Sequence, residues 1–89
     1  MKREDVYKLI DGERDYQDER WSYGTTETGG VHTSSNDWLV YMHDYIQEAM
    51  HYNSRNGDPQ AKDFAMENIR KITAMGVAAM EQIETKHRL

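Results

Sequence analysis

Cysteine is absent from this chain of 89 residues. Its absence excludes disulfide bonds, cysteine nucleophiles and thiolate metal sites, and mildly favours an intracellular location. A chain of this length forms one domain at most, and a domain so small buries little apolar surface. We therefore expect a single domain over residues 1–89 that gains stability by forming a homo-oligomer.

Long apolar runs and an excess of basic residues are also missing. No segment approaches the roughly 20 apolar residues of a membrane span, and the N-terminus, Met1-Lys2-Arg3-Glu4-Asp5, lacks the apolar core of a signal peptide. The chain has 11 basic and 16 acidic residues, whereas proteins that grip nucleic acid through its phosphates carry basic patches. The composition predicts a soluble cytoplasmic protein that binds neither nucleic acid nor a membrane.

Apolar residues recur at helical spacing in three segments of the chain. This pattern predicts an all-α fold, a three-helix chain that forms a helical bundle completed by oligomerisation. The predicted helices span about Arg3 to Trp21, Asn36 to Asn53, and Asp58-Pro59 to Thr85.

The predicted helix boundaries carry recognisable signals. Segment 23–35 is rich in glycine, threonine and serine, and has no apolar period, as is typical of a loop. Ser34 and Asp37 have the spacing of a capping box at the start of the second helix. Asp58 followed by Pro59 is typical of an N-cap with proline at the first helical position.

The third helix is apolar nearly all the way round between Ile72 and Met80. Such a helix needs neighbours on two sides. Because the other two helices would cover only part of it, we predict that copies of the chain associate here, with Gly76 allowing close backbone approach. In the alternative interpretation, Ala74 and Ala78 on the far side are simply good helix formers at the surface.

Asp44 and Glu48 stand one turn apart on the second helix. Carboxylates at this spacing bring their oxygens to one place, as in the magnesium sites of helical bundles. With His51 they occupy one shoulder of the apolar face that holds Trp38. They are candidate metal ligands or contacts for a cationic group; alternatively, they are charged residues that flank an apolar stripe.

Glu13 and Gln17 continue the apolar line of the first helix, so we predict that they point inward. Buried polar groups need partners. The pair therefore either bonds to another helix or lines a pocket, because an unpaired carboxylate in a core is costly.

Three basic residues are candidate partners for the acidic shoulder. Arg14 and Arg20 of the first helix could pair with Asp44 or Glu48. Lys71 of the third helix would pair with one of them if its side of that helix meets the acidic shoulder; alternatively, Lys71 faces solvent. For Lys71, such an ion pair would fill the space that a metal ion would otherwise use.

The loop between the first two helices offers two further possibilities. Backbone N–H groups at the start of the second helix could hold a phosphate, and His32 could act as a general base. Alternatively, the loop is a connector and its histidine is solvated. The chain has no P-loop, nucleophile elbow or His-Glu-x-x-His zinc motif, and we assign no catalytic residue.

The chain resembles small phage-type members of the MazG-like, all-α nucleoside triphosphate pyrophosphohydrolase superfamily. Their signature, E-R-x-x-Q-x-x-x-W, H and W-L, is similar to Glu13-Arg14-x-x-Gln17-x-x-x-Trp21, then His32, then Trp38-Leu39. The end of their second core helix is similar to Ala78-Ala79-Met80-Glu81. The resemblance covers most of the chain and implies a MazG-like helical domain.

The superfamily holds magnesium against a triphosphate with two acidic boxes, E-E-x-x-E and E-x-x-D. The resemblance places Asp44, Tyr45 and Glu48 in the first box, and Asn68 and Lys71 in the second. Asp44 and Glu48 are thus the only carboxylates that the resemblance places in these two boxes. A hard cation such as Mg²⁺ needs carboxylate charge to bind. The resemblance therefore implies a broken metal site, in which the ammonium of Lys71 replaces the charge of the ion.

Three functions follow as expectations. The first is a non-catalytic protein that binds or sequesters a nucleotide and needs no cofactor; its pocket is lined by Glu13, Gln17, Asp44, Glu48 and Lys71, with Trp21 or Trp38 stacking on a base. The second is an active pyrophosphohydrolase that binds Mg²⁺ through Asp44, Glu48 and Glu13. The third is a protein that inhibits a host enzyme through its acidic surface.

Overall fold

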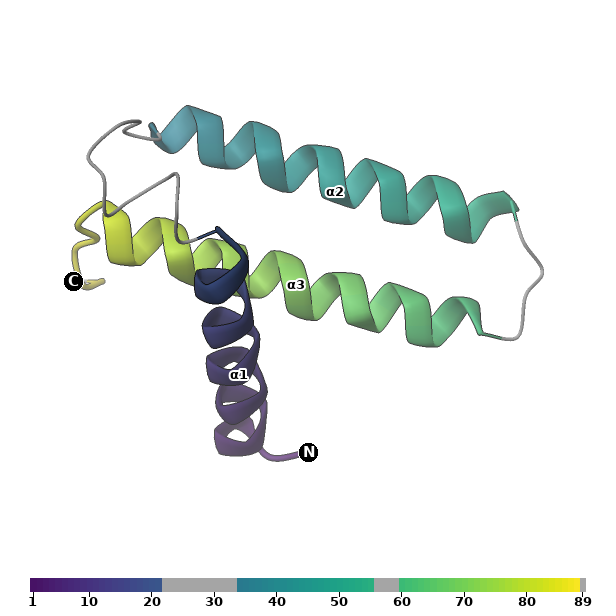
Figure 1. Cartoon of the computed structure of the whole chain (residues 1–89), viewed down its shortest axis with the longest axis horizontal. Helices are drawn as coiled ribbons and strands as arrows, with labels where there is room; N and C mark the ends of the chain where they lie inside the picture. The colour runs from purple at the N-terminus through teal and green to yellow at the C-terminus, as the bar shows by residue number, and fades with distance from the viewer. Residues whose placement is uncertain (22–33, 56–59, 89) are drawn as a thin grey trace.

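Three α-helices make up the described part of the chain, which contains no strand (Figure 1). The computed structural model describes residues 1–21, 34–55 and 60–88, and the side chains of residues 21 and 53–55 lie outside the described part. The helices are α1 (Arg3–Trp21), α2 (Ser35–Arg55) and α3 (Ala61–Gln82). The all-α prediction is confirmed, with each helix within three residues of its predicted bounds.

The start of α2 is fixed by the predicted capping box. The Ser34 hydroxyl accepts a hydrogen bond from the backbone N–H of Asp37 at 3.1 Å, and the Asp37 carboxylate accepts one from the backbone N–H of Ser34 at 3.1 Å. These two bonds satisfy donors that no helical carbonyl reaches. The third helix differs from expectation: α3 begins at Ala61 with Gln60 as its N-cap, so the predicted cap at Asp58-Pro59 lies outside the described residues.

The central element is α3, on which both other helices pack. Figure 1 shows α2 and α3 antiparallel and side by side, whereas α1 crosses α3 and its N-terminal half extends beyond the pair. Within the described residues, α1 and α2 do not pack on each other. None of these helices is long and apolar enough to cross a membrane.

The apolar part of α3 is covered on two sides, as its sequence predicts. Ala74 is 0% exposed and Ala78 is 7% exposed, so the alternative that they are surface residues is wrong. The α1 side chains of Arg14 and Gln17 bond to α3 beside them. Because alanine projects so little from the helix, α1 can lie close against this side.

Gly76 also serves the packing within one chain. A Cβ atom placed on it would lie 3.6 Å from the terminal methyl of Met42 on α2. We predicted that Gly76 and its neighbouring alanines would admit a second copy. That placement is wrong, because α1 and α2 of the same chain occupy both sides. The oligomeric state itself stays a prediction.

Candidate functional site

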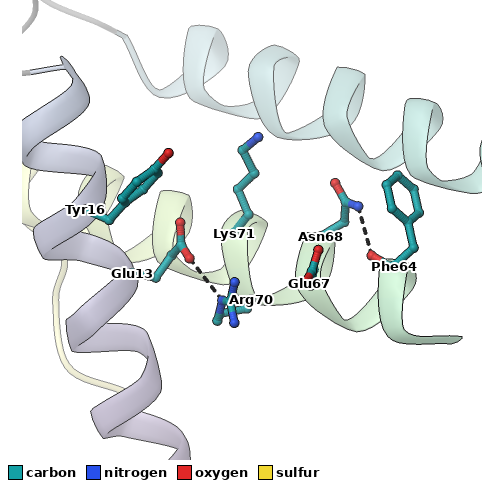
Figure 2. Close-up of a pocket in the computed structure, with 7 residues that line it drawn as sticks. All are labelled: Glu13, Tyr16, Phe64, Glu67, Asn68, Arg70 and Lys71. Carbon is teal, nitrogen blue, oxygen red and sulfur yellow. Dashed lines mark hydrogen bonds and ion pairs between the residues drawn. The ribbon is translucent and has the colours of Figure 1, made fainter. Parts of the chain in front are cut away.

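A pocket of about 380 Å³ lies between α1 and the first half of α3 (Figure 2). It combines charged, amide and aromatic side chains. Its lining residues are Glu13, Tyr16, Phe64, Glu67, Asn68, Arg70 and Lys71. The α3 members repeat every three or four residues, which places them along one face of the helix. The crossing of α1 closes one end of this face.

Glu13 and Arg70 form the polar join between the two helices at the pocket. The Arg70 Nε donates to the Glu13 Oε1 at 3.0 Å, as Figure 2 shows. The Glu13 side chain is largely buried, whereas that of Arg70 is half exposed. The prediction that Glu13 points inward is therefore confirmed. Its two alternatives both hold, because Glu13 bonds to α3 and lines the pocket.

Lys71 reaches from α3 toward α2 and ends over an aromatic ring. Its Nζ lies 4.4 Å from the ring centroid of Tyr45, a cation–π contact. Among the described residues, no ion pair joins Lys71 to Asp44 or Glu48. The predicted pairing is wrong because Tyr45, at the centre of the face that α2 turns to α3, intercepts the ammonium while both carboxylates stay exposed in water.

Aromatic and amide groups complete the lining. Asn68 donates from Nδ2 to the backbone carbonyl of Phe64 at 2.9 Å, which leaves its Oδ1 as an acceptor. The Phe64 ring packs on Tyr52 of α2, with centroids 4.1 Å apart. Tyr16 is exposed, and the guanidinium of Arg20 lies 5.7 Å from its ring centroid. Arg20 therefore contacts a residue of its own helix. The predicted pairing of Arg20 with Asp44 or Glu48 is wrong.

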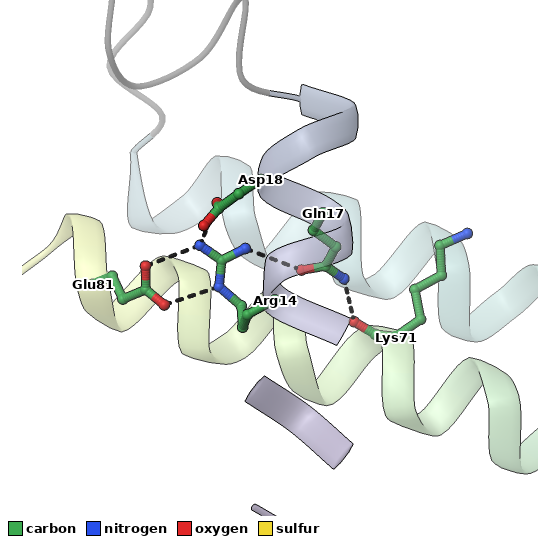
Figure 3. Close-up of polar contacts among 5 residues, drawn as sticks. All are labelled: Arg14, Gln17, Asp18, Lys71 and Glu81. Carbon is green, nitrogen blue, oxygen red and sulfur yellow. Dashed lines mark hydrogen bonds and ion pairs between the residues drawn. The ribbon is translucent and has the colours of Figure 1, made fainter. Parts of the chain in front are cut away.

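A second polar cluster, centred on Arg14, joins α1 to the C-terminal end of α3 (Figure 3). The Nε and one terminal nitrogen of Arg14 each donate to Glu81 at 2.9 Å, and that terminal nitrogen also donates to Asp18 at 2.7 Å. The bonds from Arg14 lower the pKa of the Glu81 carboxyl and raise the pKa of the guanidinium. The predicted pairing of Arg14 with Asp44 or Glu48 is thus also wrong.

Gln17 lies at the centre of the α1–α3 contact and is 1% exposed. Its Nε2 donates to the backbone carbonyl of Lys71 at 3.0 Å, and its Oε1 accepts from Arg14 at 3.4 Å. The inward orientation predicted from the helical pattern is confirmed. Gln17 does not line the pocket; it holds α1 against α3 beside the pocket (Figure 3).

The remaining predicted binding residues lie away from the pocket. The Trp38 indole N–H donates to Gln82 at 2.7 Å, eleven residues and therefore roughly 16 Å along α3 from Lys71. The side chain of Trp21 lies outside the described residues, as does His32. Asp44 and Glu48 project into solvent, and no group of three or more His, Asp or Glu side chains in the described ranges could hold a metal ion.

Several lining residues escaped the sequence-based prediction, above all Tyr16, Phe64 and Arg70. A signal for the α3 members exists in the sequence: positions 64, 67, 68 and 71 share one helical face. Nothing local indicates that α1 would cross that face.

Comparison with known proteins adds no relative. No protein-family model, no curated protein and no solved structure matches this chain. The resemblance to the MazG-like superfamily consequently rests on the motif residues alone.

Proposed function

We propose that this protein binds a nucleotide in the pocket between α1 and α3 and does not hydrolyse it. The observation that supports this proposal most is that Lys71 has no carboxylate partner among the described residues. Lys71 lines the pocket, and its ammonium rests on the Tyr45 ring. A phosphate would supply the counter-charge that this lysine lacks.

Three further lining residues, Tyr16, Asn68 and Arg70, suit the other parts of a nucleotide. Arg70 carries a second positive charge beside Lys71, only partly neutralised by Glu13 because its side chain is half exposed. Tyr16 lines the pocket and is 55% exposed, so its ring can stack on a base, whereas the Phe64 ring already packs on Tyr52. The Asn68 amide offers both a donor and an acceptor to a base edge.

The contact between Lys71 and Tyr45 is weak enough to be exchanged for a phosphate. For a half-buried pair such as Lys71 and Tyr45, the cation–π contact gains about 1 kcal/mol, between the values for exposed and desolvated pairs, whereas a charge-assisted hydrogen bond contributes about 1.5–3 kcal/mol. Lys71 can therefore turn from the ring to an anion with a net gain. The ring meanwhile keeps the ammonium near the pocket.

The same lysine disfavours hydrolysis by the magnesium mechanism that the resemblance implies. A divalent cation needs carboxylate charge, and Lys71 and Asn68 occupy the positions of the second acidic box. We therefore favour a MazG-like bundle that keeps a nucleotide site and has lost its metal site. Activity that depends on Asp44, Glu48 and Mg²⁺ remains the alternative.

Ligand-induced stabilisation tests binding. The purified chain is heated with each common nucleoside triphosphate and with linear and cyclic dinucleotides, without metal. A ligand present at 100 times its dissociation constant adds about 2.7 kcal/mol to the stability of the fold. If no nucleotide raises the melting temperature, the proposal is wrong and the protein-inhibitor hypothesis gains.

A matched pair of lysine variants locates the site. Lys71→Gln should weaken binding of the identified nucleotide about 10- to 100-fold, the range expected from a lost charged hydrogen bond of about 1.5–3 kcal/mol. Lys62→Gln removes the same charge from an exposed position of α3 outside the pocket and should leave affinity unchanged. If both variants lose the same affinity, the nucleotide binds outside this pocket, and its affinity depends on the overall charge of the chain.

A pyrophosphate assay distinguishes binding from turnover. The wild-type chain is incubated with each nucleoside triphosphate and Mg²⁺, and no pyrophosphate release is expected. If the wild-type chain releases pyrophosphate and the Glu48→Ala variant does not, the protein is a pyrophosphohydrolase instead.

A further inference from the structure

The carboxylate of Glu67 lines the candidate pocket without a partner among the described residues. Glu67 is exposed on α3, and no hydrogen bond or ion pair within the described ranges engages it. The other lining carboxylate, that of Glu13, is bound by Arg70. An unpaired carboxylate repels the phosphates of a nucleotide. If Glu67 contributes to binding, it therefore contacts another part of the ligand.

Glu67 and Lys71 hold opposite charges apart along the pocket. They stand four residues apart on α3 with the glutamate nearer the N-terminus, which is the most favourable order for an ion pair within a helix. The structure does not form this pair. Instead, Lys71 extends toward α2, and its Nζ lies 4.4 Å from the ring centroid of Tyr45 (Figure 2). The pocket thus presents one group for an anion and a separate group for hydrogen-bond donors.

Asn68 follows Glu67 in the sequence and lines the same pocket. Its Nδ2 donates one hydrogen to the backbone carbonyl of Phe64 at 2.9 Å, which leaves the second N–H and the Oδ1. An ionised carboxylate has two acceptor oxygens and no donor. The two side chains together therefore offer a pair of carboxylate acceptors beside an amide that still has one donor.

Guanine is the common base whose hydrogen-bonding edge matches this arrangement. Its N1–H and its 2-amino group are adjacent donors, and O6 is an acceptor next to them. Adenine and cytosine each place an amino donor beside a ring nitrogen that accepts, and uracil places its single N–H between two carbonyls. A carboxylate that faces any of these three accepts one hydrogen bond and meets an acceptor beside it.

We propose that Glu67 selects guanine, so that the ligand of this pocket is a guanine nucleotide. The Glu67 carboxylate accepts from N1–H and the 2-amino group, the remaining N–H of Asn68 donates to O6, and Lys71 pairs with a phosphate. This inference rests on the proposed nucleotide binding and adds the identity of the base. The carboxylate that would only repel phosphate then makes charge-assisted hydrogen bonds to the base.

A series of five triphosphates tests the choice of base. Guanosine, inosine, adenosine, cytidine and uridine triphosphates carry the same ribose and phosphates, so differences in affinity report the base. Isothermal titration calorimetry without metal should show the guanosine compound binding on the order of 10-fold tighter than the last three, as hydrogen bonds to a solvated carboxylate would produce. Inosine triphosphate lacks the 2-amino group and should fall between them.

A substitution of Glu67 separates base selection from folding. The amide of Glu67→Gln offers one donor and one acceptor, the pattern that suits adenine. This variant should bind guanosine triphosphate on the order of 10-fold more weakly and adenosine triphosphate at least as tightly as the wild type, an exchange that loss of structure cannot produce. Glu84→Gln removes the same charge at an exposed position outside the pocket and should leave both affinities unchanged.

Three results would overturn the inference. The first is equal affinity for all five triphosphates, or tighter binding of one that lacks guanine and hypoxanthine. The second is a Glu67→Gln variant that binds all five more tightly, because Glu67 would then act only by repelling phosphate. The third is that none of the five binds; the proposed function fails as well only if the dinucleotides of its own test also give no stabilisation.

Discussion

Replacing Arg14 by methionine removes the centre of the polar cluster that joins α1 to α3. Methionine fills the space of the arginine stem, so the apolar contacts of that stem are largely kept. What is lost is the bond pair to Glu81, the bond to Asp18 and the donor to the buried Gln17. Arg14→Met therefore isolates the polar contribution.

The expected loss follows from how exposed each partner is. The side chains of Glu81 and Asp18 are 53% and 67% exposed, so water solvates them once Arg14 is gone, and together they lose about 1 kcal/mol. The Oε1 of Gln17 is buried and keeps no other donor among the described residues, which costs roughly 1 kcal/mol more. The sum is about 2 kcal/mol, or a fall in melting temperature on the order of 10 °C.

The pH dependence of this loss gives a second test. Arg14 lowers the pKa of Glu81 in the folded state. The ionised Glu81 therefore contributes its full stabilisation at pH values above the ordinary glutamate pKa of about 4.3. That stability disappears as the pH falls through the lower pKa of the folded state. The difference between wild type and Arg14→Met should thus shrink in acid, leaving mainly the part due to Gln17.

Urea denaturation followed by circular dichroism measures both quantities. Arg20→Met is the matched control. The guanidinium of Arg20 lies 5.7 Å from the ring centroid of Tyr16 on the same helix, and loss of this contact should cost about 0.5 kcal/mol. A double-mutant cycle with Glu81→Gln isolates the pair itself. A loss below about 0.5 kcal/mol for Arg14→Met, or one that is the same in acid and at neutral pH, would refute the reasoning.

Five further substitutions, at four positions, test the packing and the helix start. Gly12→Ala and Gly76→Ala should each stabilise the chain by about 0.5–1 kcal/mol, because both lie inside helices and an added methyl meets nothing at Gly12 and only an ordinary contact with Met42 at Gly76. Ser34→Ala should cost about 1 kcal/mol in thermal denaturation by removing the cap of α2, and Ser34→Gly should cost less. Ala74→Leu should cost about 1–3 kcal/mol, because no space remains between α1 and α3; an unchanged melting temperature would contradict the close packing described.

Local signals in the sequence identified the elements of this fold well. The period of apolar residues located three helices, and the Ser34–Asp37 spacing placed the start of α2 correctly, because a capping box is made within one turn. The inward direction of Glu13 and Gln17 was also predictable, since it depends only on the 3.6-residue period of one helix. The start of α3 was less predictable, because the helix begins after the Asp-Pro signal.

Contacts between helices were predicted poorly. Lys71, Arg14 and Arg20 were each expected to meet the acidic shoulder of α2, and none does. A helical wheel gives directions around one axis, but it does not give the angle at which two axes cross. Because α1 crosses α3 and does not pack on α2, its arginines never approach Asp44 or Glu48.

The sequence by itself determined the three helices, the cap of α2 and the faces on which polar residues lie, because these properties depend on neighbours within about one turn. Only the tertiary structure decided which faces meet. It brought Glu13 to Arg70 and Arg14 to Glu81 across more than fifty residues of chain, and so formed the candidate pocket. It also covered Ala74, because the packing of α1 against α3 depends on the fit of whole helical surfaces.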